Sequence, residues 1–140
     1  MGLDTSHGCW HGAYSAFMRW RHKIAEVAGY AVWKVKHDDG MVQDTIMMDW
    51  GHIIRDNPGY LMGEWNTVPA DPLVMLFAHQ DCEGVIHPEH AGPIADRLEE
   101  LFPLLDGDGG GHVGDYHAKT QLFIDGLRLA ASKGEPVDFH

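Results

Sequence analysis

Apolar side chains between residues 12 and 28 recur at alternating spacings of four and three, the periodicity of one face of an α-helix. The stripe consists of Ala13, Phe17, Trp20, Ile24 and Val27. Gly29 follows where such a helix would stop, because glycine readily adopts the left-handed conformation of a C-terminal cap. The pattern therefore predicts an amphipathic helix over residues 12–28.

The pattern changes directly after this helix and predicts a β-hairpin. Residues 30–36 are rich in aromatic and β-branched side chains, which are typical of a strand. Residues 37–40, His-Asp-Asp-Gly, form a turn signal, and residues 41–48 fit a return strand. These two strands would pair antiparallel.

Weaker signals place the remaining elements. Residues 2–9 fit a brief strand or extended arm, and residues 135–139 fit a short terminal strand. A helix is expected over residues 93–102, with proline at its first position. A last helix is expected over residues 117–133, with Leu122, Phe123, Leu127 and Ala130 facing inward.

Three further segments are less regular. The apolar run 73–78 fits either a helix capped by Asp71 or a short buried strand. Residues 49–70 hold a turn, and the glycine-rich residues 106–114 form a loop. Together the elements predict an α+β fold, a single compact domain with about three helices and a small antiparallel sheet or hairpin.

Composition limits the functions open to this chain. Its 140 residues are 44% hydrophobic and 22% charged, which is ordinary for one globular domain spanning residues 1–140. The formal net charge of −11 argues against binding to nucleic acid or to an anionic membrane. No apolar run could span a membrane, and the two cysteines share no redox or zinc motif. We therefore expect a cytoplasmic protein.

The segment from His79 to His90 carries the clearest chemical signal. Aligned with a calcium loop of the EF-hand type, Asp81 and Glu83 fall at ligand positions and Gly84 at the sharp turn. The two end positions hold histidines, however, where calcium needs oxygen ligands. Imidazoles mixed with carboxylates favour a divalent transition metal, zinc first, over calcium. The candidate metal ligands are His79, Asp81, Glu83, His87 and His90.

This segment also has a simpler interpretation, because Asp-x-Glu-Gly can be only a tight turn before a helix. Cys82 lies within it, but the flanking carboxylates oppose thiolate formation and make it a poor nucleophile. A second donor cluster, His7, Cys9 and His11, could bind zinc if its side chains converged, but a helix entry is the better interpretation. A third group of donors, residues 112–117, is interpreted mainly as part of a surface loop.

The first predicted helix mixes aromatic and cationic side chains near its start. Arg19 suits bidentate contacts with phosphate or carboxylate, and Tyr14 offers an aromatic face for stacking. These residues could line a nucleotide-like pocket. The alternative is an ordinary helix with core aromatics and solvated arginines.

Several segments carry a resemblance to a known group of proteins. They are Gly2–His7, Gly12–Arg21, His79–Gly84 and the tail from Phe123 to Phe139. Together they resemble an uncharacterised family of small phage and bacterial proteins, whose hallmark His-x-Asp-Cys-Asp-Gly has Glu83 here in the last acidic position. The likeness implies a phage or bacterial origin, and hence the cytoplasm of a bacterial host cell. It also implies one possible site that joins His7, Tyr14 and Arg19 to residues 79–84.

Three functions remain open from the sequence. The first is a small protein that binds a divalent metal or a small ligand at residues 79–90. The second is a phage anti-defence protein that sequesters a signalling nucleotide or binds a host protein. The third is a metal-dependent hydrolase in which Asp81 or Glu83 would activate water. The sequence leaves open whether the protein is an enzyme and leans toward a binding protein.

Overall fold

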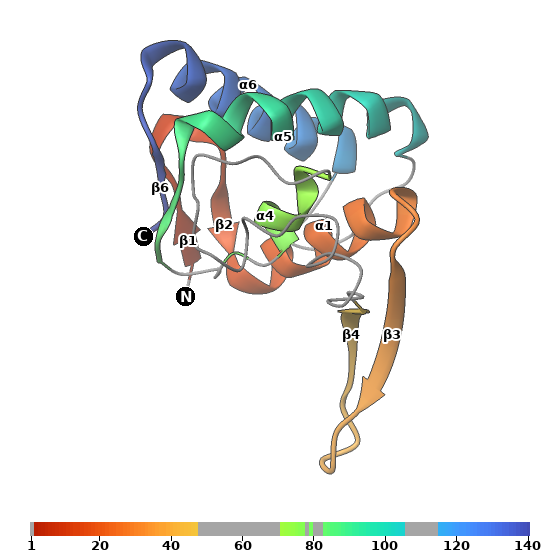
Figure 1. Ribbon diagram of the computed structural model, residues 1–140. Coiled ribbons are helices and arrows are strands. Elements are labelled where there is room, and N and C mark those ends of the chain that lie inside the picture. Colours follow the sequence, from red (N-terminus) through yellow and green to blue (C-terminus); the bar gives the residue numbers. More distant parts are fainter. Residues whose placement is uncertain (1, 48–70, 78, 80–82, 106–114) are drawn as a thin grey trace, which may run out of the picture.

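The computed structural model describes residues 2–47, 71–77, 79, 83–105 and 115–140 (Figure 1). They form the predicted α+β fold. Its helices are α1 (Tyr14–Val27), α4 (Leu73–Phe77), α5 (Pro88–Leu101) and α6 (Tyr116–Lys133), with two 3-10 turns, η1 (Ser6–Gly8) and η2 (Phe102–Leu104). Its strands are β1 (Gly2–Asp4), β2 (His11–Ala13), β3 (Ala31–Lys36), β4 (Val42–Met47), β5 (Val85–Ile86) and β6 (Val137–Asp138). Each described strand pairs antiparallel with one neighbour.

Helix α1 supplies the centre of the core, and its apolar stripe is buried as predicted. Phe17, Trp20 and Ile24 are fully enclosed. The ring of Phe123 in α6 packs against Trp20 with a centroid distance of 4.7 Å. The helix ends before Gly29, whose φ of 93° only glycine adopts without strain. The helix expected over residues 12–28 is therefore confirmed.

Helices α5 and α6 lie side by side over this core (Figure 1). The side chain of Asp115 caps α6 by accepting a hydrogen bond from the His117 backbone N–H at 2.9 Å. Gly134 closes the helix in the left-handed conformation. The helix expected over residues 117–133 is confirmed, but Leu122 is 53% exposed, so its predicted inward orientation was wrong.

The start of α5 also differs from the prediction. The helix begins at Pro88, with His87 as its N-cap, and Pro93 lies inside it. Both prolines satisfy the same preference for the first turn, and the earlier one marks the true start. As a consequence, His90 lies in the first turn of a helix and is buried, whereas the sequence placed it in a loop.

The two chain ends form one small sheet region. Strand β1 pairs with β2, and β5 pairs with β6. A bridge between Thr5 and Phe139 connects the two pairs, and Asp4 and His140 exchange backbone hydrogen bonds of 3.1 and 2.8 Å. The expected N-terminal arm and C-terminal strand are thus both present.

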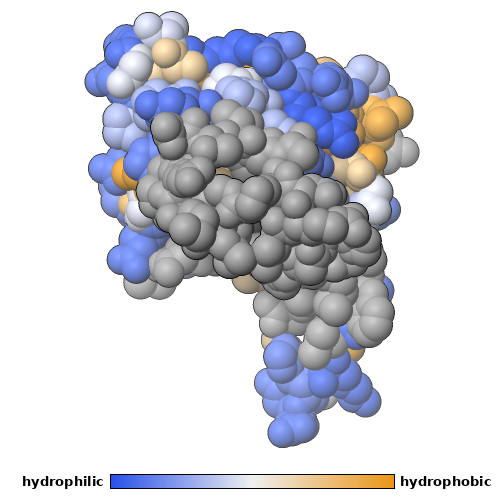
Figure 2. Space-filling model, viewed as in Figure 1, coloured by the Kyte–Doolittle hydropathy of each residue, from blue (hydrophilic) through white to orange (hydrophobic). Residues whose placement is uncertain are grey.

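The predicted hairpin is confirmed as β3 and β4, which pair from Ala31–Met47 to Lys36–Val42. It projects away from the body of the protein (Figure 1). Its outer end is mostly hydrophilic in Figure 2, although Met41 and Val42 are exposed there.

The apolar run after Asp71 is helical rather than extended, and the Asp71 carboxylate accepts a hydrogen bond from the Leu73 N–H at 3.0 Å. The predictions for residues 49–70 and 106–114 lie outside the described residues. Among the described helices, none has the length and apolar character needed to cross a membrane.

Candidate functional site where the chain ends meet residues 79–87

The structure brings together three segments that the sequence singled out separately. The N-terminal arm reaches the C-terminal strand through the Thr5–Phe139 bridge. The Phe139 N–H donates a hydrogen bond to the Gly84 carbonyl at 2.9 Å, which attaches the 79–84 segment to the same strand. Phe139 therefore lies at a junction of the chain ends and the segment with the most metal-ligand types.

His79 has a well-defined place at this junction. Its ring packs on the ring of Phe139, with centroids 4.1 Å apart. Its Nε2 lies 3.0 Å from the Val85 carbonyl oxygen, so the tautomer with hydrogen on Nε2 donates to that carbonyl. The glycine at position 84 fits the ring, because a Cβ there would lie 3.4 Å from it.

Arg21 forms hydrogen bonds with the main chain where this segment begins. It is buried in α1, and its guanidinium donates to the carbonyl oxygens of His79 at 2.6 Å and Leu76 at 3.3 Å. Carbonyls at the end of a helix such as α4 have no partners within the helix. Arg21 therefore closes α4 and fixes where the 79–84 segment begins.

The other predicted metal ligands are spread along this region. Glu83 is exposed, His87 is half-buried and His90 is buried. The rings of His87 and His90 lie nearly perpendicular to each other, with centroids 6.1 Å apart. Asp81 lies outside the described residues. Among the described residues, no three side chains of His, Cys, Asp or Glu gather closely enough to hold a metal ion.

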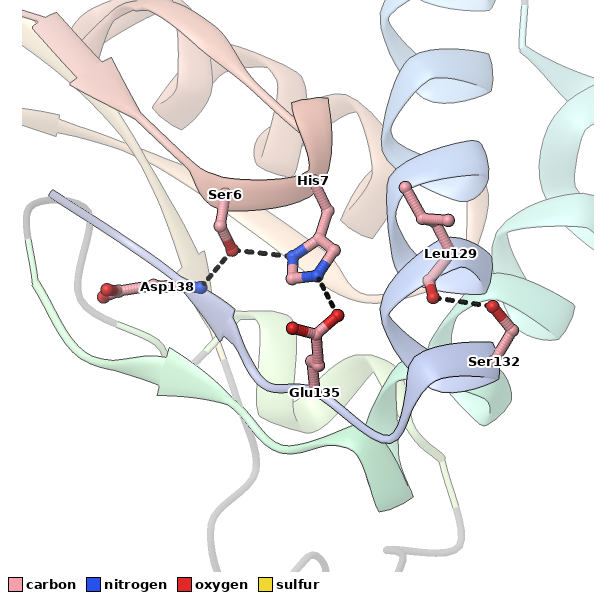
Figure 3. Close-up of polar contacts among 6 residues, drawn as sticks. All are labelled: Ser6, His7, Leu129, Ser132, Glu135 and Asp138. Carbon is pink, nitrogen blue, oxygen red and sulfur yellow. Dashed lines mark hydrogen bonds and ion pairs between the residues drawn. The ribbon is translucent and has the colours of Figure 1, made fainter.

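His7 takes part in a different cluster, shown in Figure 3. Ser6 Oγ lies 2.7 Å from His7 Nδ1 and accepts a hydrogen bond from the Asp138 N–H at 2.8 Å. His7 Nε2 lies 3.4 Å from Glu135 Oε1. The Ser6 hydroxyl can thus donate to Nδ1 while Nε2–H faces the carboxylate.

This cluster joins the turn η1 to the last strand. His7 has a φ of 60°, the only positive value among the described residues other than glycine, and that conformation turns its ring between Ser6 and Glu135. Left-handed backbone in a non-glycine residue is strained and persists only where surrounding contacts hold it. The contacts to Glu135 and Asp138 supply this support, so the cluster fastens the two chain ends together.

The predicted ligand-binding set of His7, Tyr14 and Arg19 does not meet at a common point through described contacts. Tyr14 is the first residue of α1 and packs against the core, and Arg19 is exposed. Within the described residues, neither forms a hydrogen bond or an ion pair with His7.

The structure separates His7, Cys9 and His11, which the sequence offered as a possible zinc cluster. Cys9 points into the core, whereas the His11 side chain is 89% exposed and lies 3.5 Å from Asp4. Burial raises the pKa of the Cys9 thiol to about 12, although a hydrogen bond with Thr5 opposes the shift. Cys9 is therefore a neutral packing residue at physiological pH and does not provide a thiolate.

Sequence reasoning missed two residues that meet near β2. Trp10 is buried at 2% exposure, and the Nζ of Lys119 in α6 lies 4.8 Å from its ring centroid. Lys119 also lies 3.5 Å from the His11 carbonyl oxygen. A separation of more than 100 positions left no pattern in the sequence that could pair them.

Comparisons of the chain with known protein families, curated proteins and solved structures found no match. The candidate site must therefore be argued from its own residues.

Proposed function

We propose that the protein binds a divalent transition metal, zinc first, in the segment 79–90, with the imidazole of His79 as its anchoring ligand. The hydrogen bond from His79 Nε2–H to the Val85 carbonyl supports this proposal most directly. Metal-bound histidines almost always donate their other ring N–H to a carbonyl or carboxylate, which fixes the tautomer and the ring direction. In this tautomer Nδ1 carries the lone pair that would bind the metal.

The surroundings of His79 favour a preorganised ligand. The ring of Phe139 supports one side of the imidazole, and Arg21 holds the main-chain carbonyl of the same residue. A ligand whose orientation is already fixed loses little conformational entropy when the metal arrives. These contacts on both the ring and the main chain of His79 support its role as a preorganised ligand.

Oxygen ligands would come from the acidic side chains that follow. Glu83 is exposed four positions after His79, and Asp81 stands between them in the sequence. One imidazole with carboxylates suits zinc or a related ion, and it suits calcium less. The neighbouring rings of His87 and His90 would offer a second pair of nitrogen ligands in the same segment.

Metal analysis tests the proposal on protein purified without a polyhistidine tag or a nickel column. After equilibration with zinc and removal of excess metal, we expect stoichiometric zinc and a melting temperature that falls with chelator. His79→Gln and the surface variant Glu83→Gln should each lower the zinc content. His11→Gln is the matched control, because that exposed histidine lies outside the segment.

Two results would contradict the proposal. One is substoichiometric zinc in the natural sequence together with a melting temperature that chelator leaves unchanged. The other is a His11→Gln variant that loses as much zinc as Glu83→Gln, which would indicate scattered binding to surface histidines. Circular dichroism of each variant separates loss of metal from loss of fold.

A further inference from the structure

The indole of Trp10 is a buried hydrogen-bond donor that has no acceptor among the residues that the structure describes. Its Nε1 is enclosed by protein, and it donates no hydrogen bond within the described part of the chain. Buried polar groups nearly always have partners, so each exception calls for an explanation. An acceptor supplied by a ligand is one such explanation.

Lys119 brings a positive charge to the same place. Its Nζ lies 4.8 Å from the Trp10 ring centroid and 3.5 Å from the His11 carbonyl oxygen. Within the described residues, no carboxylate forms an ion pair with it, in contrast to Arg97 and Arg128. This ammonium group is therefore held in place by an aromatic ring and a carbonyl rather than by an opposite charge.

The two donors converge beside Gly12. The point where a Cβ would stand on this glycine lies 3.5 Å from Trp10 Nε1 and 3.9 Å from Lys119 Nζ. That point is only a bond length from the Gly12 Cα, so a ligand oxygen would have to lie farther out, between the two donors. It could accept hydrogen bonds from both groups once the lysine side chain moves and uncovers the enclosed indole N–H.

Two further basic residues lie near the corner of the molecule that Trp10, Gly12 and Lys119 form. Lys23 of α1 places its Nζ 5.7 Å from the ring of Tyr116, which is one turn before Lys119 in α6. Arg19 lies one turn before Lys23 on α1 and is exposed. Three of the ten basic residues thus lie around one corner of a chain with a net charge of −11.

We propose that this corner binds the phosphate group of a small phosphorylated molecule, with Trp10 Nε1–H and Lys119 as the donors. A phosphate carries up to two negative charges and three terminal oxygens, so it can contact these donors and also face Lys23 and Arg19. The site is separate from His79 and does not depend on metal binding there.

Proton–nitrogen NMR of the tryptophan indoles tests this site in the full-length protein, with inorganic pyrophosphate as the probe at constant ionic strength. Loss of one signal in Trp10→Phe assigns the Trp10 indole. We expect pyrophosphate to shift that signal in a saturable manner and acetate to leave it nearly unmoved. Lys119→Gln should weaken the binding about tenfold, the value of one charge-assisted hydrogen bond. Lys119→Arg should retain most of it.

Lys133→Gln is the matched control, because it removes one positive charge from the far end of the same helix. Its affinity for pyrophosphate should stay within about twofold of the natural sequence, since long-range charge alone has a small effect at physiological salt. A Trp10 indole that pyrophosphate does not shift would overturn the proposal. So would equal weakening by Lys119→Gln and Lys133→Gln, which indicates non-specific attraction. An equal response to acetate would refute the assignment to phosphate.

Discussion

Two buried indoles lie side by side in the core and differ in the fate of their N–H groups. Trp20 donates from Nε1 to Thr120 Oγ1 at 2.9 Å, across the interface of α1 and α6. The ring of Trp10 lies 5.5 Å from that of Trp20, yet its Nε1 has no hydrogen-bond partner in the described part of the chain. An unsatisfied buried donor costs about 1–3 kcal/mol. The indole N–H therefore stabilises the fold in Trp20 and lowers its stability in Trp10.

The difference separates structural polar groups from groups available to a ligand. On the Trp20 side, Trp20 and Arg21 donate hydrogen bonds that join elements, although the Nε of Arg21 has no hydrogen-bond partner in the described part of the chain. On the Trp10 side, the indole Nε1 and the Lys119 Nζ both lie within 4 Å of the point where a Cβ on Gly12 would stand. The proposed phosphate would supply the acceptor that the enclosed Trp10 N–H lacks among the described residues.

The largest loss of stability should come from replacing Arg21, the buried cation that follows Trp20 in α1. Arg21→Met keeps much of the side-chain volume but removes the guanidinium donor of the His79 carbonyl and one of the two donors of the Leu76 carbonyl. We expect a loss of about 3 kcal/mol in the free energy of unfolding, measured by urea denaturation. Arg19→Met, an exposed change on the same helix, should stay within about 0.5 kcal/mol. Equal effects of the two variants would show that Arg21 has no special structural role.

A smaller effect is expected where α6 meets the N-terminal turn. A Cβ on Gly126 would lie 2.9 Å from both the Cys9 backbone nitrogen and the His7 carbonyl oxygen, which real Cβ atoms essentially never approach so closely. We expect Gly126→Ala to destabilise the protein by about 2 kcal/mol, because backbone must shift to make room.

The matched control for this substitution is Gly92→Ala in α5. No atom would lie within 4 Å of a Cβ there, so the higher helix propensity of alanine should stabilise the protein by about 0.5–1 kcal/mol. Thermal and urea unfolding of both variants measure the difference. A Gly126→Ala protein as stable as Gly92→Ala would mean that η1 does not pack tightly on α6.

Some features of this fold could be predicted from the sequence, and others could not. Helix α1 and the hairpin were predicted well, because their signals repeat every few residues or lie in one turn. The start of α5 was misplaced, since Pro88 and Pro93 satisfy the same local rule and only packing distinguishes them. Leu122 was misassigned for a related reason: α6 has apolar residues on more than one side.

The candidate sites were harder to predict because they depend on distant pairings. The meeting of Thr5, Gly84 and Phe139 rests on strands of two or three residues, which are too short for any periodicity. The sequence shows which side chains of residues 79–90 could bind a metal, but it does not show where those side chains point. His79 packs on Phe139, whereas His87 and His90 lie against each other in an edge-on arrangement.

The smallest loss of stability is expected from a substitution that makes the two buried indoles alike. Thr120→Val removes the acceptor of the Trp20 indole, so that its N–H, like that of Trp10, would have no partner within the described part of the chain. We expect a loss of about 1 kcal/mol in the free energy of unfolding, together with a changed NMR signal for that indole proton. Thr120→Ser, which keeps the hydroxyl, should retain the indole signal although it also loses a methyl group. If Thr120→Val proved neutral, an unpartnered indole would be tolerated in this core at no cost. The bare N–H of Trp10 would then give no reason to expect a ligand, and the phosphate site would have to stand on Lys119 alone.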